Sequence, residues 1–335
     1  MNRALRNIFI AAAGLAVITA CGGGSDDGGG LVGSVPPAEP ASITVENAPL
    51  IAGSVAEVAM GQGIFTSIFA PAIPIGSVGE DAAVSPVMKP VYSAAMKTAS
   101  PSQLYATSAG REPCAVSGTV DVTANVSNPE RLSVNDRFDL QFMECDDGLG
   151  TVIDGGMSIT ITSISGDIAS GDFLLGMQIG LSTFSVTENG ETTTANGTIT
   201  ITLDTTNPTV TMISIATSAL VTTSAGREEV ISNLTVQITE DTSTFPVAVT
   251  VETSFTFSSP RIGGEVTVTT TLALQSMGED HPFVGELRIE GAGGAVIAMI
   301  ALDANTVRLQ IDIDGDGATD ETVDMTWDEL MAAAA

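Results

Sequence analysis

The feature that most constrains the fold of this chain is a two-residue alternation of aliphatic side chains with threonine, serine or charged side chains, which begins after Pro113. Successive side chains of a strand point to opposite faces, so this alternation is typical of antiparallel strands that bury one face and expose the other. Clear examples are Ser158–Thr162, Thr198–Leu203, Leu234–Ile238, Val266–Thr269 and Val307–Ile311.

Turn-forming residues separate about a dozen such runs, as at Glu188–Gly190, Thr206–Pro208 and Gly291–Gly294. No stretch between them is long and helical enough to serve as the crossover that parallel strands need. We therefore expect a mainly β protein with a short N-terminal helical segment. Its long antiparallel meander would form a curved sheet, a sandwich or a partly open barrel.

One hexapeptide occurs twice in this region, at Thr107–Glu112 and at Thr223–Glu228. Each copy leads into an alternating segment. The repeat fits either an old duplication of a β-unit or two similar turns.

The segment before the β-region has a different character. A helix is expected from Ala48 to Met60, capped by Asn47 and stopped by Gly61–Gly63. A second helix is expected from Pro86 to Thr98, and the Pro- and Gly-rich stretch Phe65–Asp81 is expected to be a loop.

The N-terminus has the parts of a secretory signal, with arginines followed by the apolar run Ile8–Ala20, which is too short to span a bilayer. The sequence Ile18–Cys21 resembles the bacterial lipobox, which implies that Cys21 is lipidated and becomes the new N-terminus. The glycine-rich stretch Gly22–Gly30 follows directly and would act as a flexible leash. Several acyl chains on one residue hold a protein stably on a membrane.

These patterns divide the chain into four parts. Residues 1–20 are expected to be a lipoprotein signal peptide, and residues 21–43 a flexible tether. Residues 44–105 are expected to form a short helical and irregular segment, and residues 106–335 the antiparallel β-body with a calcium-type loop at 312–320.

Two cysteines follow Cys21, and an oxidising envelope compartment favours a disulfide between Cys114 and Cys145. They bracket two alternating segments, 116–126 and 137–144, so the bridge would close the open end of a β-hairpin. The apolar residues of both segments are even-numbered, whereas one cysteine is even and the other odd. A bulge or a frayed strand end must absorb this difference.

The charge balance limits the partners of the protein. With 40 acidic and 11 basic residues, the formal net charge is −29. Phosphate binding needs clustered Lys and Arg, and this chain has few basic residues. Nucleic acid is therefore not an expected partner. The expected membrane contact is the lipid anchor, because an anionic bilayer surface would repel the body.

The strongest local motif is the acidic run from Asp312 to Asp320. Calcium takes six to eight oxygen ligands, and acids at alternate positions around a glycine turn supply them. The run resembles the calcium loops of EF-hands, dockerins and integrin propellers, although Val323 stands where an EF-hand carries its glutamate. The predicted calcium ligands are the carboxylates of Asp312, Asp314, Asp316 and Asp320 with the carbonyl of Ala318.

Signals for catalysis are weak, and we expect no enzyme. The single histidine, His281, lacks a nucleophile-elbow motif and is expected to be a loop residue. The acidic pair Asp146–Asp147 is expected to be solvated. The stretch Gly291–Gly293 lacks the third glycine of a dinucleotide loop and is expected to lie between strands.

Several short motifs together resemble those of a group of lipoproteins from Gram-negative bacteria to which no activity is assigned. Besides the lipobox and the leash, they are Pro113–Gly118, Glu144–Gly148, the Asp-Gly-Asp-Gly run and the ending Thr326–Leu330. The resemblance implies a location and an architecture, and it implies nothing about mechanism. Because Gly22 replaces the aspartate that retains enteric lipoproteins in the inner membrane, the implied location is the outer membrane.

The expected function is therefore that of a non-catalytic cell-envelope lipoprotein, a structural or binding module at the outer membrane. An envelope protein, a polysaccharide or a lipid would be its partner. The alternative is a periplasmic carrier or chaperone of lipid or lipoprotein, which would need a cavity lined by Ile159, Ile161, Ile199 and Ile201.

Overall fold

The structure is a computed structural model that describes residues 38–60, 108–127, 132–146, 148, 150–168, 171–188, 190–278 and 281–334. Within them, one antiparallel sheet contains 14 strands, each hydrogen-bonded to the next along the chain. The strands are β1 (Ser108–Pro113), β2 (Ser117–Asn125), β3 (Arg137–Asp146), β4 (Thr151–Asp167), β5 (Asp172–Glu188), β6 (Glu191–Asn207), β7 (Val210–Ser224), β8 (Arg227–Asp241), β9 (Ala248–Ser259), β10 (Gly264–Ser276), β11 (Val284–Glu290), β12 (Val296–Ala301), β13 (Thr306–Asp312) and β14 (Glu321–Thr326).

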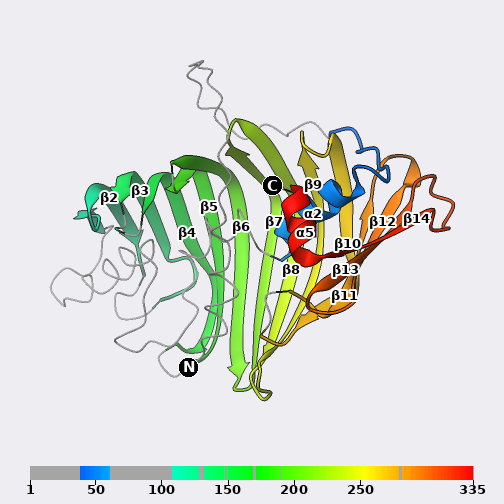
Figure 1. Ribbon diagram of the computed structural model, residues 1–335. Helices are drawn as coiled ribbons and strands as arrows, with labels where there is room; N and C mark the ends of the chain where they lie inside the picture. Colours follow the sequence, from blue (N-terminus) through cyan, green and yellow to red (C-terminus); the bar gives the residue numbers. More distant parts are fainter. Residues whose placement is uncertain are drawn as a thin grey trace.

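The predicted meander is confirmed, and of the three predicted shapes the structure has the curved sheet. Strands β1 and β14 do not pair in the described part of the chain, so the sheet is open (Figure 1). All five alternating runs named above lie within strands, in β4, β6, β8, β10 and β13. The predicted turn residues lie at strand ends or between strands: Glu188 ends β5, Thr206 and Asn207 end β6, and 291–294 lies between β11 and β12.

The alternation predicts the buried face of the sheet. In β2, Val120 and Val122 are at most 3% exposed, and in β6 Ile199 and Ile201 are at most 1% exposed, while the residues between them are more accessible. The aliphatic residues of this face belong to one buried cluster that extends from β2 to β13. Hydrophobic burial along one face therefore holds the sheet together.

Bulges bend the sheet. The pairs from β2–β3 through β6–β7 each contain a register shift. At two of them a glycine with positive φ faces the bulged residue: Gly118 lies against the carbonyl of Glu144, and Gly155 against the carbonyl of Thr183. Because a bulge bends its strand and increases the twist, this series of bulges accounts for the curvature of a sheet that would otherwise be flatter.

Two helices lie side by side against the C-terminal part of the sheet (Figure 1): α2 (Ala48–Ala59) and α5 (Trp327–Ala334). They approach closely at Gly53, where a Cβ atom would lie 3.0 Å from Cβ of Ala334 and would collide with the carbonyl of Leu330. The strands nearest to the helices are β12, β13 and β14. The only other described helix is the single-turn 3-10 helix η1 (Ala292–Gly294), which links β11 to β12.

The helix predicted from Ala48 to Met60 is confirmed, but the prediction that Asn47 caps it with its side chain is wrong. The Oδ1 atom of Asn47 accepts a hydrogen bond from the backbone N–H of Thr44 at 2.8 Å, so it faces the preceding turn and not the helix. The two residues form a local turn of their own, since the N–H of Asn47 donates to Oγ1 of Thr44 at 3.2 Å. Local side-chain bonds of this kind compete with capping.

The last residues of the predicted tether pack onto the body. Pro40 forms a parallel bridge with Glu265, and Ala41 and Ile43 are at most 2% exposed. Residues 1–37 and 61–107 lie outside the described residues. The signal peptide, Cys21, most of the tether, the second helix and the predicted loop fall there.

The repeated hexapeptide has two different structures. Residues 108–112 of the first copy lie within strand β1, whereas Thr223–Glu228 contains the turn between β7 and β8, with Ala225 and Gly226 at positive φ. The interpretation as two similar turns is therefore wrong. Context, and not the hexapeptide itself, determines its conformation.

Candidate functional site

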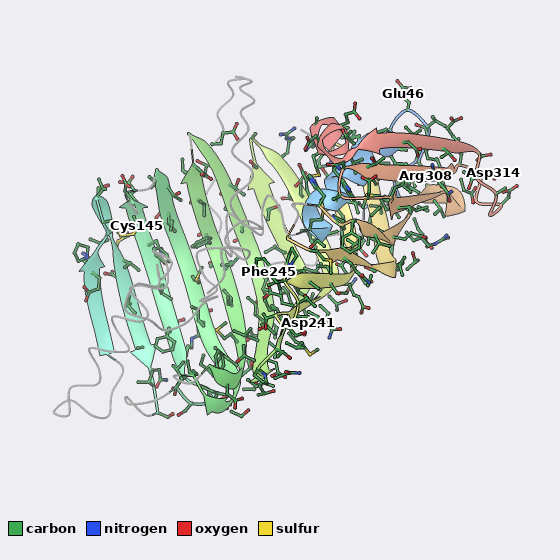
Figure 2. The ribbon with its side chains drawn as sticks, turned by 60° about the horizontal axis from the view of Figure 1, so that its bottom comes forward. Glu46, Cys145, Asp241, Phe245, Arg308 and Asp314 are labelled. Carbon is green, nitrogen blue, oxygen red and sulfur yellow. A yellow bond between two sulfur atoms is a disulfide. The ribbon has the colours of Figure 1, made fainter. Side chains whose placement is uncertain are left out.

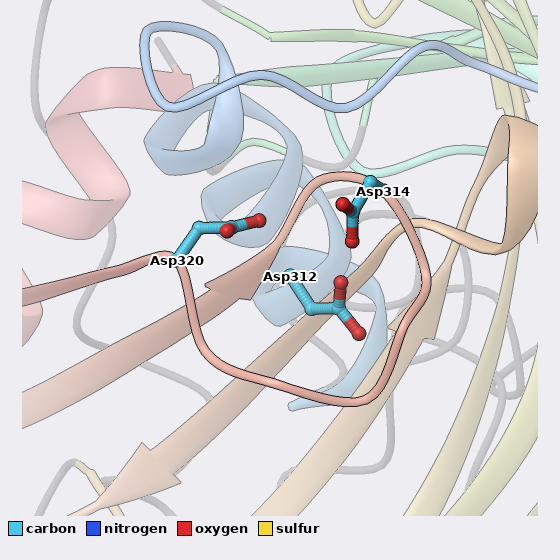
Figure 3. A group of neighbouring side chains, drawn as sticks. All are labelled: Asp312, Asp314 and Asp320. Carbon is cyan, nitrogen blue, oxygen red and sulfur yellow. The ribbon is translucent and has the colours of Figure 1, made fainter.

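The acidic loop connects β13 to β14, at the margin of the sheet opposite to Cys145 (Figure 2). Carboxylate oxygens of Asp312, Asp314 and Asp320 lie within 4.8 Å of one another. Figure 3 shows the three carboxylates directed toward the inside of the loop. Three converging carboxylates can hold a metal ion, and hard cations are the ones that oxygen ligands favour.

Backbone N–H groups of the loop already donate to these carboxylates. Asp312 accepts hydrogen bonds from Gly315 at 2.8 Å and from Gly317 at 2.9 Å, and Asp320 accepts one from Ile313 at 2.8 Å. These bonds offset part of the repulsion between the acids. Each carboxylate has about four lone-pair sites, so acceptor capacity remains for a cation.

The fourth predicted aspartate, Asp316, is not a member of this group of carboxylates, and the carbonyl of Ala318 stays a prediction. The Oδ1 atom of Asp316 accepts a hydrogen bond from the N–H of Ala318 at 2.7 Å, which directs this carboxylate along the loop. The structure thus brings together three of the four predicted aspartates.

Besides its connections to β13 and β14, the acidic loop contacts the body at η1. A Cβ atom at Gly315 would lie 2.9 Å from the carbonyl oxygen of Gly294, so the two loops touch through their backbones. On its other side η1 contacts the N-terminal segment, because the N–H of Ala292 donates to the carbonyl of Ala41 at 2.7 Å. An ion in the acidic loop would therefore stabilise the last hairpin and its contact with η1.

The predicted disulfide is confirmed. Cys114 and Cys145 are bonded, with their Cα atoms 5.4 Å apart. The predicted irregularity is also present, as a bulge at Glu144 that faces Gly118 between β2 and β3. Because disulfides persist in oxidising compartments, the bridge indicates a location outside the cytoplasm.

His281 lies in the connection between β10 and β11. Its imidazole ring stacks on the indole ring of Trp327, with the ring centroids 5.6 Å apart and the planes at 7°. Trp327 begins α5 and is 1% exposed. The observed contact of the histidine is thus one of packing against the core.

The remaining weak motifs have ordinary surroundings. Asp146 accepts a hydrogen bond from the N–H of Gly148 at 2.8 Å, while Asp147 lies outside the described residues. The glycine-rich stretch Gly291–Gly294 lies between strands β11 and β12, as predicted.

One unusual acid was missed in the sequence. Burial raises the pKa of Glu57, on α2, to about 7, with a smaller lowering effect from Arg261 and a raising effect from Glu229. Glu229 accepts a hydrogen bond from the hydroxyl of Ser259 at 3.0 Å. The signal was present, because Glu57 is the single charged residue in the apolar helix sequence Ala48–Ala59.

A second buried acid was also missed. Glu240 continues the series Val236 and Ile238 on the buried face of β8 and is 4% exposed. Burial alone raises the pKa of this carboxyl above its ordinary value. An acid at a position where the alternation requires an aliphatic residue could have been recognised from the sequence.

The most exposed large apolar side chain that the structure describes is Phe245, at 96%, in the connection between β8 and β9 (Figure 2). A single exposed ring of this kind does not form a contiguous apolar patch. None of the described helices has both the length and the hydropathy needed to cross a membrane.

Comparison of the chain with models of protein families, with curated proteins and with solved structures found no match.

Proposed function

We propose that this protein is a non-catalytic lipoprotein of the bacterial outer membrane, and that its sheet serves as a structural or binding module. The anchor would be Cys21 in its lipobox-like sequence. The disulfide between Cys114 and Cys145 supports a location outside the cytoplasm, in agreement with export.

The observation that carries the binding part of the proposal is the chemistry of the outer face. Opposite its buried face, the sheet presents long rows of hydroxyl-bearing side chains, such as Thr198, Thr200 and Thr202 in β6. Such a face offers donors and acceptors over many strands, and it does not aggregate as an apolar face would.

We further propose that the acidic loop binds calcium. The three carboxylates of Asp312, Asp314 and Asp320 would be its protein ligands, with backbone carbonyls and water supplying the rest. The role would be structural, since the loop contacts η1 and closes the last hairpin.

The anchoring is tested by replacing Cys21 with serine in cells fed a labelled fatty acid. The proposal predicts label in the wild-type protein and its sedimentation with outer membranes. It predicts that Cys21→Ser has no label and does not sediment with the membranes. A variant that keeps both properties would contradict the proposal.

The second candidate function is that of a carrier of lipid or lipoprotein. The described helices pack near β12, β13 and β14, whereas the four isoleucines predicted to line a carrier's cavity lie in β4 and β6. All four are nonetheless at most 2% exposed. Acyl chains that co-purify with the protein and are detected by native mass spectrometry would establish the carrier; their absence would favour the binding module.

A further inference from the structure

The outer face carries a shallow groove of about 450 Å³ over strands β2 to β6. Its floor follows a row of directly paired residues that runs across the strands. The row consists of Thr123, Asp139, Ser158, Gly180 and Thr198. Adjacent strands are about 4.8 Å apart, so this row extends over about 19 Å.

Two glycines make the groove. Gly180, in β5, is the one position of this row without a side chain, and Gly156, in β4, lies in the neighbouring row between Gln141 and Ser182. A Cβ atom at Gly180 would lie only 2.7 Å from the hydroxyl of Ser158, so that hydroxyl reaches over the missing side chain. A Cβ atom at Gly156 would lie 3.3 Å from Oε1 of Gln141. Polar groups thus border the two positions of the groove that have no side chain.

The charges beside the groove are paired. Arg111 binds Asp121 through two hydrogen bonds of 2.6 and 2.8 Å, and Arg137 binds Asp139, with a shortest contact of 2.7 Å. Two arginines therefore balance the two carboxylates of the lining, on a protein whose formal net charge is −29. A polyanion would be repelled by the acidic body, and a polycation would find no unpaired carboxylate in the groove.

The remaining polar groups are uncharged and available. Within the described part of the chain, the hydroxyls of Ser158, Ser182 and Thr198 form no hydrogen bond with the protein. They project from three neighbouring strands. The lining contains no aromatic ring, so hydrogen bonds and not ring stacking would hold a ligand.

We propose that this groove binds a neutral, hydroxyl-rich glycan chain. The inference deepens the proposed binding function by naming a site and a ligand class. A linear glycan has hydrogen-bond donors and acceptors along its whole length. The hydroxyl, amide and ion-paired groups of the groove are also donors and acceptors, so the two surfaces match in their chemistry. Because hydrogen bonds exposed to water contribute little each, binding requires several sugar units in contact with several strands.

The test is isothermal titration calorimetry on the full-length protein, in a detergent without a sugar head group. The probes are three neutral linear hexasaccharides, built from α-linked glucose, β-linked glucose and N-acetylglucosamine. The groove variant Ser158→Ala/Ser182→Ala/Thr198→Val removes the three hydroxyls. The matched control, Ser214→Ala/Thr235→Val/Ser254→Ala, removes three hydroxyls from the outer face of β7, β8 and β9, outside the groove.

The proposal predicts that at least one probe binds and that its Kd rises about tenfold or more in the groove variant. The control is expected to keep the wild-type Kd. No binding of any probe, or an equal loss in both variants, would overturn the proposal. The Cys21→Ser experiment is independent of this one, so a failure of glycan binding leaves the result on anchoring unchanged, and the reverse also holds.

Discussion

The imidazole of His281 and the indole of Trp327 stack with their planes 7° apart, which joins the connection between β10 and β11 to the start of α5. They are the only histidine and the only tryptophan of the chain. The indole N–H also donates to the carbonyl of Asp303 at 3.3 Å. Tryptophan fluorescence therefore reports the docking of α5 without contributions from any other tryptophan.

Removal of the indole is expected to destabilise the protein strongly. Trp327 is 1% exposed, and truncation of a buried aromatic residue costs about 3 to 5 kcal/mol. We expect Trp327→Ala to lose this much in urea unfolding followed by circular dichroism, and Trp327→Phe to lose less.

His281→Ala should shift the tryptophan emission toward longer wavelength because it uncovers one ring face. An unchanged emission would contradict the stacked arrangement.

The disulfide is expected to stabilise the fold through the unfolded state. A bridge across a separation of 31 residues contributes about 3 to 4 kcal/mol in the chain-entropy model. The double variant Cys114→Ser/Cys145→Ser should lose that amount in denaturant unfolding. Addition of a reductant should lower the stability of the wild-type protein to that of the variant and leave the variant unaffected. A reductant effect on the variant would point to another cause.

The bulge between β2 and β3 gives a prediction with an internal control. Gly118 has φ of 79° and lies against the carbonyl of Glu144, whereas Gly110, in β1, has free space around it. Gly118→Ala should cost at least about 2 kcal/mol, because a side chain is strained there and collides with backbone. Gly110→Ala should be neutral or slightly stabilising. Equal effects of the two substitutions on the unfolding free energy would show that the bulge is not formed.

The buried acid on α2 makes stability depend on pH. The folded-state pKa of Glu57, about 7, lies above its ordinary value of 4.5, so folding favours the protonated form. The free energy of unfolding therefore includes the full stabilising contribution of this protonated carboxyl below pH 4.5 and loses it as pH rises to about 7. Glu57→Gln should remove this slope, and at pH 8 the variant should be more stable than the wild type by on the order of 2 kcal/mol. Parallel pH profiles of both proteins would refute the assignment.

The acidic loop predicts a calcium effect. Calcium should raise the melting temperature of the wild-type protein by mass action. Asp314→Asn/Asp320→Asn should abolish both the shift and the heat of binding in calorimetry. Glu46→Gln, which removes an exposed acid outside the loop, should leave both intact. A shift that survives in the loop variant would place the calcium elsewhere.

The strands were predictable because their signal is local. Alternation, as in Thr198–Leu203, needs no knowledge of distant residues, and the parity of Cys114 and Cys145 predicted a bulge or a frayed strand end, of which the structure has the bulge. The choice between a sandwich, a barrel and an open sheet was not predictable. It depends on where bulges fall and on which edges pair, and the positive φ of Glu144 has no signature in the sequence.

The candidate sites also differ in whether their residues are close together in the sequence. The acidic loop was recognised because its ligands are neighbours in sequence, although the direction of the Asp316 side chain follows from a hydrogen bond to Ala318 that spacing alone does not specify. The groove was missed because it requires the register that places Gly180 beside Ser158 and Thr198. Such pairing is long-range information that a single sequence does not contain.

The central claim, that this β-protein is exported, oxidised and lipid-anchored, is tested most directly by intact mass spectrometry of the protein isolated from the envelope of a Gram-negative host. The predicted mass is that of a chain beginning at Cys21, increased by its acyl chains and decreased by two hydrogens for the bridge between Cys114 and Cys145. A chain that retains residues 1–20, or that carries no lipid on Cys21, would contradict the account.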